Sequence, residues 1–308
     1  MDLDGAQKLK LEDKATFDKY FERFTPLNSE FTFTNLFMWR NFYELLYLEF
    51  DSHLIVYSNE YLRKRKPPSS GNYNAKYFFP PIGPNPAEIM KQIMEEINDV
   101  EFHRVPENII DQLDKDYVSN NLEIQEDRDN WDYVYDAEEL INLAGNKYRQ
   151  NRRWLNKFLE RYEYEFQTLT EETVEKTKEL QLEWCIMRDC EDDEGLEQEH
   201  EAIYEALNNF RVLGFTGAVI CINGGCAAYT FGEMLNPETL VIHVEKAHMK
   251  YQGGYQAINN LFLKNFFPHV KYVNREQDLG VDGLRKAKES YKPINMVKKY
   301  IVFPKRNK

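Results

Sequence analysis

Long apolar runs are absent from the sequence. No stretch approaches the roughly 18 consecutive apolar residues that a membrane-spanning helix needs. Residues 1–12 are charged, so they do not resemble the apolar core of a secretion signal. We therefore expect a cytoplasmic protein with no transmembrane segment.

Cysteines are few, and their spacing does not favour a metal site. Cys185 and Cys190 form one pair five residues apart, and Cys221 and Cys226 form another. The first pair falls in a helical pattern, where such positions diverge by about 140°, and the second brackets a turn. Zinc-binding pairs usually have shorter spacings. We predict buried free thiols and no metal, and the sequence also lacks a Cys-His-Asn or nucleophile-elbow pattern.

Positive charge is in the minority. The chain has 39 Lys and Arg against 52 Asp and Glu, for a net charge of −13. This field repels polyanions and opposes broad binding to nucleic acid or anionic lipid. Basic residues nevertheless gather at 145–161 and 283–308, whereas 191–201 is strongly acidic. A phosphate-bearing partner would have to meet one of the two basic segments.

What is present favours a folded protein of mixed α+β (mixed α/β) class. The 308 residues are 42% hydrophobic and 14% aromatic, enough for a substantial core. Predicted helices alternate with strands, and Ser29 is expected to cap an aromatic helix at 31–39. The second half repeats the order of the first: helices, a strand meander at 216–245, a helix, and a further strand and helix. We predict tandem domains at 1–162 and 163–308, with a basic linking helix at 140–162.

The segment 272–300 is the most unusual part of the sequence. After the predicted strand at Tyr272 and Val273 come five polar residues in succession: Asn274, Arg275, Glu276, Gln277 and Asp278. A short helix follows, with basic residues on one side: Arg285, Lys286 and Lys288. Strand ends are common ligand sites in folds of this class. The alternative is a solvated loop with an internal ion pair.

Three other features suggest catalytic or ligand-binding roles. On the third meander strand, His243 and Glu245 alternate with apolar residues, and Glu233 lies near the end of its neighbour. Gly253 and Gly254 precede a helix whose N-terminus could hold a phosphate or carboxylate, although a plain turn explains them equally. The basic helix suits a phosphate-bearing partner or is simply solvated; its basic residues include Lys147, Arg149, Arg152 and Arg153.

Several segments resemble a known family. They are residues 29–40, 80–83, 147–158, 214–220, 243–247 and 272–280, and Asn-Arg-Glu-Gln-Asp-Leu-Gly at 274–280 is the most specific. Together they resemble the C-terminal domain of phosphatidylglycerol lysyltransferases and the stand-alone bacterial proteins of that group. The resemblance implies two tandem acyl-CoA N-acyltransferase (GNAT)-like domains, each a twisted, mainly antiparallel sheet flanked by helices.

The resemblance also implies a reaction. Enzymes of this group move an aminoacyl group from aminoacyl-tRNA to a lipid, and related peptidoglycan branching enzymes move one to an amine. The basic helix would then approach tRNA phosphates through Arg149, Arg152 and Arg153, and a cleft in the second half would hold donor and acceptor. Residues 250–255 match only the first glycine of the GNAT phosphate loop, which favours aminoacyl-tRNA over acetyl-CoA as the donor.

Acyl transfer needs a base, donors for the developing oxyanion, and positive charge for a phosphate-bearing donor. Glu233, His243 and Glu245 are candidate bases, and Arg275 or backbone amides could stabilise the oxyanion. Arg285, Lys286 and Lys288 could meet phosphate. Glu276 and Asp278, beside Asn274 and Gln277, could hold an ammonium group.

We therefore predict an acyl- or aminoacyltransferase acting on an amine or hydroxyl acceptor, such as a lipid head group at the membrane surface or a cell-wall precursor. Two other functions stay open. One is a catalytically silent module that binds RNA or a cell-wall precursor. The other is a coenzyme A-dependent N-acetyltransferase.

Overall fold

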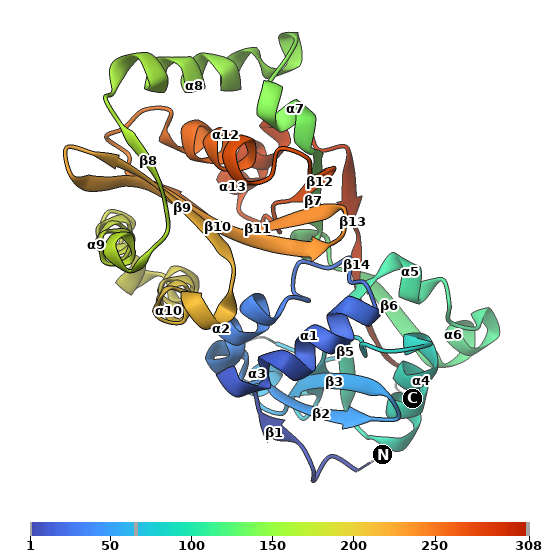
Figure 1. Ribbon diagram of the computed structural model, residues 1–308. Coiled ribbons are helices and arrows are strands. Elements are labelled where there is room, and N and C mark those ends of the chain that lie inside the picture. Colours follow the sequence, from blue (N-terminus) through green and yellow to red (C-terminus); the bar gives the residue numbers. More distant parts are fainter. Residues whose placement is uncertain (1, 65–66, 306–308) are drawn as a thin grey trace. The chain divides into compact units, whose positions relative to one another are not determined.

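The computed structural model describes residues 2–64 and 67–305 (Figure 1). The chain forms two compact units, which we call unit 1 (Met1–Asp132 with Val297–Lys308) and unit 2 (Tyr133–Met296). These units differ from the expected division at residue 162. The strand Asp132–Asp136 pairs with Tyr272–Asn274, and the C-terminal strand Lys299–Pro304 pairs with Val100–Pro106. The end of the basic segment, 306–308, lies outside the described residues.

Unit 1 is built on a seven-stranded sheet. Its strands, in spatial order, are β1 (Gln7–Lys8), β2 (Leu46–Phe50), β3 (His53–Ser58), β4 (Lys76–Phe78), β5 (Val100–Pro106), β14 (Lys299–Pro304) and β6 (Leu122–Glu126). All neighbours are antiparallel except β4 and β5. The helices are α1 (Lys14–Arg23), α2 (Phe33–Tyr43), α3 (Tyr61–Lys64), α4 (Pro86–Glu96), α5 (Glu107–Ile110) and α6 (Lys115–Asn121).

Two groups of apolar side chains hold unit 1 together. Met90 and Ile93 of α4 pack with Phe102 of β5 in one fully buried cluster. Phe17 of α1 lies 5.4 Å from the ring of Phe33 and 4.9 Å from that of Tyr47. Phe17 therefore packs α1 against α2 and β2.

Unit 2 has a second seven-stranded sheet. Its strands, in spatial order, are β13 (Asn295–Val297), β7 (Asp132–Asp136), β12 (Tyr272–Asn274), β11 (Thr239–Ala247), β10 (Gly225–Asn236), β9 (Thr216–Ile222) and β8 (Glu165–Thr168). The helices are α7 (Ala137–Asn142), α8 (Arg149–Arg161), α9 (Glu171–Ile186), α10 (Glu194–Asn208), α11 (Phe210–Leu213), α12 (Gly254–Phe266) and α13 (Asp282–Ser290). Helix α12, with α7 and α8, covers one face of the sheet, and α9 and α10 cover the other (Figure 1).

Both units contain the same parallel step. In unit 1, α4 connects β4 to the parallel strand β5, and in unit 2, α12 connects β11 to the parallel strand β12. The remaining pairs of known register are antiparallel. The predicted fold class, two mainly antiparallel sheets flanked by helices, is confirmed. Within the described chain, every helix falls short of the length and apolar content that crossing a bilayer requires.

Two local predictions are wrong. Cys185 and Cys190 form a disulfide rather than two free thiols, because α9 ends at Ile186 and the chain turns through Asp189 (φ 51°), bringing the two Cα atoms within 5.2 Å. Cys221 and Cys226 are free, as predicted, although Cys226 is only partly buried. The second wrong prediction is the N-cap of α2. It is Thr32 rather than Ser29, and its side chain accepts a hydrogen bond from the amide of Asn35.

Ser29, the expected cap, has a different role. Its amide and hydroxyl both donate to Asp132, each at 2.9 Å. Both residues are fully buried. Ser29 therefore satisfies a buried carboxylate.

Candidate active site

A bulge in the sheet of unit 2 positions His243. Phe231 of β10 pairs with Val244 of β11, and Gly232 pairs with Ile242, so His243 is the extra residue. A Cβ atom on Gly232 would collide with the carbonyl oxygen of Val241, which explains why a glycine stands here.

The bulge also reverses the side-chain alternation along β11. Ile242 and Ala247 belong to the same core cluster although they are five positions apart, an odd number that regular alternation would place on opposite faces, and Glu245 contacts Asn259 of α12. The strict alternation expected from 240 to 245 is therefore interrupted at His243.

His243 lies between two carboxylates. Its Nε2 is 3.0 Å from Glu233 Oε1 on β10, and its Nδ1 is 2.9 Å from Glu276 Oε1 after β12. The imidazole is 1% exposed, whereas the side chains of Glu233 and Glu276 are 19% and 18% exposed. Burial alone would lower the pKa of His243, but the hydrogen bonds and charges of the two carboxylates raise it to about 9. At neutral pH the group is an imidazolium, so it is a poor general base.

A second buried pair lies beside this one. Arg275 donates from Nε and Nη2 to Glu245 Oε2, at 2.9 and 2.6 Å. Asn259 donates to the other carboxylate oxygen of Glu245 at 2.7 Å. The guanidinium also lies over the rings of Tyr291 and Tyr135, 4.5 and 5.5 Å from their centroids. Because both oxygens of Glu245 accept hydrogen bonds, this carboxylate is suited to orienting Arg275 rather than to removing a proton.

Asp278 anchors the loop that follows β12. Its side chain is fully buried and accepts hydrogen bonds from Tyr133 Oη at 2.6 Å, from the amide of Gly280 at 2.9 Å, and from Arg285 through Nε and Nη2 at 2.9 and 2.8 Å. Asn274 is also buried and accepts from the amide of Glu276, whose φ is 56°. These contacts fix the direction of Glu276.

The predicted phosphate-binding residues of α13 differ in environment. Arg285 is bound to Asp278, and Lys288 donates to the carbonyl oxygen of Arg275. Lys286 is exposed and Gln277 is half-buried. Of the three basic residues, Lys286 is the one whose side chain stands in solvent.

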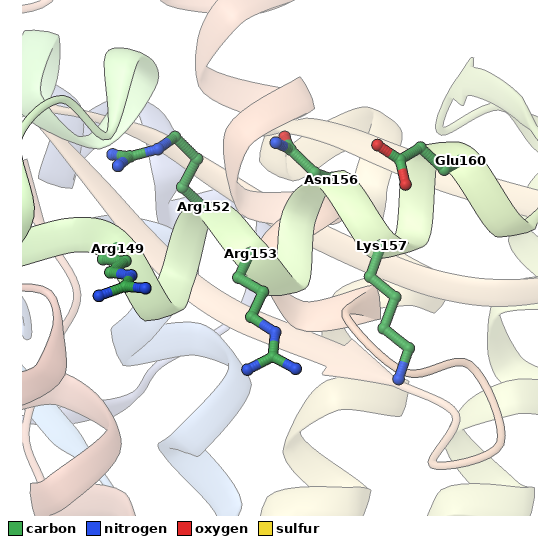
Figure 2. A pocket seen from close by; sticks show the side chains of 6 residues that line it. All are labelled: Arg149, Arg152, Arg153, Asn156, Lys157 and Glu160. Atoms are coloured by element: carbon green, nitrogen blue, oxygen red, sulfur yellow. The ribbon is translucent and has the colours of Figure 1, made fainter.

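Arg149, Arg152, Arg153 and Lys157 of α8 line a surface depression of about 480 Å³ together with Asn156 and Glu160 (Figure 2). Arg152 donates to the carbonyl oxygens of Leu143 and Gly145, and Lys147, just before α8, pairs with Glu139 at 2.6 Å. Arg149 and Arg153 are exposed. Among the described residues, neither has an ion-pair partner. These two side chains are the ones best placed to meet an external anion.

Gly253 and Gly254 are explained by packing. Gly253 has a φ of 90°, and a Cβ there would collide with the carbonyl oxygen of Trp154 in α8. A Cβ on Gly254 would come within 3.0 Å of Ala247. Close contact with α8 and β11 therefore accounts for both glycines without a bound phosphate.

Four residues that the sequence did not single out belong to this site: Tyr135, Asn151, Asn259 and Tyr291. One of them left a detectable signal. Asn151 shares the buried face of α8 with Leu155 and Phe158, at the helical spacing i, i+4, i+7. A polar residue on an otherwise apolar face requires a partner, and this could have marked Asn151.

The fold is that of a tandem GNAT-like protein, with two mainly antiparallel sheets that each contain one helix-connected parallel step. Residues 21–303 match the family described as "Phosphatidylglycerol lysyltransferase, C-terminal", and the chain belongs to this family. A conserved protein of unknown function from Bacteroides thetaiotaomicron has a TM-score of 0.85 at 29% identity, covering 98% of this chain and 99% of that one. L-PGS from Bacillus licheniformis has a TM-score of 0.64 at 14% identity, covering 96% and 93%.

A curated relative matches over a shorter range. An uncharacterized protein of Mycoplasmoides gallisepticum is 23% identical over 180 residues. The match spans 55% of this chain and 55% of that protein, so the chain is aligned with about half of the relative's length.

Proposed function

We propose that unit 2 transfers an aminoacyl group from aminoacyl-tRNA to an amine or hydroxyl acceptor, such as a lipid head group or a cell-wall precursor. The observation that carries this proposal is the buried imidazolium of His243 between two partly exposed carboxylates, beside the Glu245–Arg275 pair. Membership of a family named for lysyl transfer to phosphatidylglycerol supports the same class of reaction.

The charges suggest how the proton moves. Glu233 and Glu276 are the members of the cluster with the most exposed surface, so a substrate can reach them while His243 between them stays buried. In this proposal one carboxylate accepts the proton of the attacking amine or hydroxyl as the new bond to the acyl carbon forms. The bond from that carbon to the ribose oxygen then breaks, and the proton passes to the leaving oxygen.

Helix α8 would bind the tRNA. Arg149 and Arg153 present charge on an otherwise acidic protein, which suits local contacts to phosphate. A coenzyme A donor is less well supported, because close packing against α8 accounts for Gly253 at the start of α12.

The proposal is tested by incubating the purified protein with a mixture of aminoacyl-tRNAs and three acceptors in turn: phosphatidylglycerol vesicles, a nucleotide-linked muropeptide, and hydroxylamine. We expect at least one of Glu233→Gln and Glu276→Gln to reduce transfer about 100-fold or more, as for loss of a general base. Glu238→Gln is the matched control, because Glu238 is an exposed carboxylate that pairs with Lys271. Transfer at the native rate in both site variants would refute these roles.

A binding measurement separates the catalytic proposal from a silent RNA-binding module. Replacing Arg149 and Arg153 with alanine should weaken tRNA binding and make it less salt-dependent, by roughly 0.9 in the logarithmic slope per lost phosphate contact. Arg211→Ala is the control, since Arg211 is exposed but pairs with Glu171. Salt-sensitive binding without transfer to any acceptor would favour the silent module.

A further inference from the structure

Three buried polar atoms in unit 2 have no hydrogen-bond partner of normal geometry: Arg275 Nη1, Asn151 Nδ2 and Tyr291 Oη. Asn151 and Tyr291 are each only 5% exposed, and the Arg275 side chain is 12% exposed. Buried donors are rarely left unbound in folded proteins, because each loses its hydrogen bonds to water. Three in one region therefore require an explanation.

The three groups lie around the phenol of Tyr291. The guanidinium carbon of Arg275 is 4.5 Å from the Tyr291 ring. Burial raises the pKa of Tyr291 to about 12, while the charge of Arg275 and hydrogen bonding by the side chains of Asn151 and Gln256 oppose this increase, so both amides approach the phenol, although the contact of Asn151 falls outside normal hydrogen-bond geometry. The hydroxyl is protonated at neutral pH and can donate a hydrogen bond.

The groups at this position are donors that lack a hydrogen-bond acceptor. Nε and Nη2 of Arg275 donate to Glu245, whereas Nη1 has no acceptor. The amide of Asn151 and the phenol of Tyr291 can also donate hydrogen bonds. A ligand that satisfies these groups must present an oxygen with lone pairs, such as a carbonyl or carboxylate oxygen. An ammonium group would not satisfy them.

Helix α8 connects this position to the basic surface. Asn151 is on the buried face of α8, whereas Arg149 and Arg153, two residues away on either side, are exposed. One helix thus offers a buried amide to an acyl group and exposed guanidinium groups to phosphates. An aminoacyl ester at the end of a polynucleotide has both features.

We propose that Arg275, Asn151 and Tyr291 bind the carbonyl oxygen of the aminoacyl ester, an inference that rests on the proposed function. When the acceptor's lone pair attacks the carbonyl carbon, the π electrons move to this oxygen, and the three donors stabilise its negative charge. The electrons return as the bond to the ribose oxygen breaks, and that oxygen leaves with the proton taken from the acceptor.

The first test uses the free protein. Tyr291→Phe and Asn151→Leu remove one unpaired donor each with little change in shape. If these donors await a ligand, the melting temperatures of both variants should equal or exceed that of the native protein. A fall of several degrees in both would indicate structural roles and overturn the inference. Tyr162→Phe and Asn265→Leu are matched controls outside the site, with hydroxyl and amide groups bonded to backbone carbonyls.

The second test measures binding with 3′-aminoacylamino-3′-deoxyadenosines, a set carrying each of the common amino acids through an amide that cannot transfer. We expect the native protein to bind at least one, and each site variant to bind it roughly tenfold more weakly, as for one lost hydrogen bond. Failure of the native protein to bind any member would overturn the inference. Equally tight binding of the free amino acid would assign the donors to a carboxylate instead.

Transfer rates separate this inference from the proposed function. Each variant should lower kcat about 100-fold, more than it weakens binding, because an oxyanion contact strengthens in the transition state. Native transfer by both variants would refute the inference and leave the proposed function standing. Probe binding that depends on both residues, without transfer by the native protein, would refute the function and leave the carbonyl site standing.

Discussion

The two units use a buried arginine at the same place in their topology and surround it differently. Arg104 lies near the end of β5, and Arg275 follows β12, the strands that close the two parallel steps. Arg104 faces two carboxylates, with Nε 3.2 Å from Glu30 and Nη1 3.0 Å from Asp127. Arg275 faces one, Glu245. The same step of the fold therefore places two carboxylates at the arginine of unit 1 and one at the arginine of unit 2, although among the described residues each guanidinium keeps one buried nitrogen without a hydrogen-bond partner.

Unit 1 extends its ionic cluster further. Lys299 of β14 is fully buried and lies 2.7 Å from Glu30 and 2.6 Å from Asp132. Tyr77 lies beside Arg104, and within the described part of the chain its hydroxyl has no hydrogen-bond partner, so a phenol is present here as well. The units differ in the second carboxylate at the arginine. This difference suggests that unit 1 uses its charges for structure, whereas unit 2 keeps a position for a ligand.

The largest loss of folding stability is expected from removing Lys299, the buried cation by which β14 contacts the rest of unit 1. Lys299→Met leaves Glu30 and Asp132 buried without their shared ammonium group, which should cost about 3–5 kcal/mol of folding free energy. Urea unfolding followed by tryptophan fluorescence would measure it. Lys298→Met is the control, because Lys298 forms an exposed pair with Glu107 and should leave the midpoint nearly unchanged. Equal midpoints in the two variants would contradict a structural role for the buried cluster.

Replacing Arg275 in unit 2 should cost less stability than replacing Lys299 in unit 1, but it should abolish function. Arg275→Met leaves one buried carboxylate, Glu245, which keeps its bond from Asn259. We expect a cost near the lower limit for such pairs, about 3 kcal/mol, together with loss of aminoacyl transfer.

Arg275→Lys separates the charge of Arg275 from its hydrogen-bond geometry. A lysine restores the charge beside Glu245 but cannot place donors on two sides as the planar guanidinium does. It should recover most of the stability measured by urea unfolding and little of the transfer rate. Recovery of both would show that Arg275 acts only as a counterion.

The sequence predicted the elements of the fold better than their partners. The strand pattern located the meander β9–β11 to within a few residues, and the glycine pair at 253–254 correctly marked the start of α12. The sequence could not predict that β14 inserts between β5 and β6, because strand order depends on contacts across almost 200 residues. Nor could it predict the disulfide, which depends on where α9 ends.

The candidate site was predicted in the same partial way. The polar run from Asn274 to Asp278 identified Arg275 and Glu276, and strand ends identified Glu233 and His243. The bulge at His243 and the loop anchored by Asp278 determine which carboxylate contacts each cation. Neither the bulge nor the loop conformation has a local sequence signal. Tyr291 follows directly after α13, and an aromatic side chain at apolar spacing does not reveal where its hydroxyl lies.

The smallest effect is a pH dependence confined to unit 2. The pKa of His243 is raised from 6.5 to about 9 by Glu233 and Glu276, so its contribution to stability is fully present below pH 6.5 and is lost as pH rises through 9. The loss between pH 7 and 10 should be on the order of 2 kcal/mol. The measurement is the difference in urea midpoint between the native protein and His243→Gln at each pH, which cancels the titration of other groups. This difference should shrink steadily above pH 7. A difference that stays constant to pH 10 would mean that His243 is neutral in the folded protein, so the buried imidazolium that carries the proposed function would be absent.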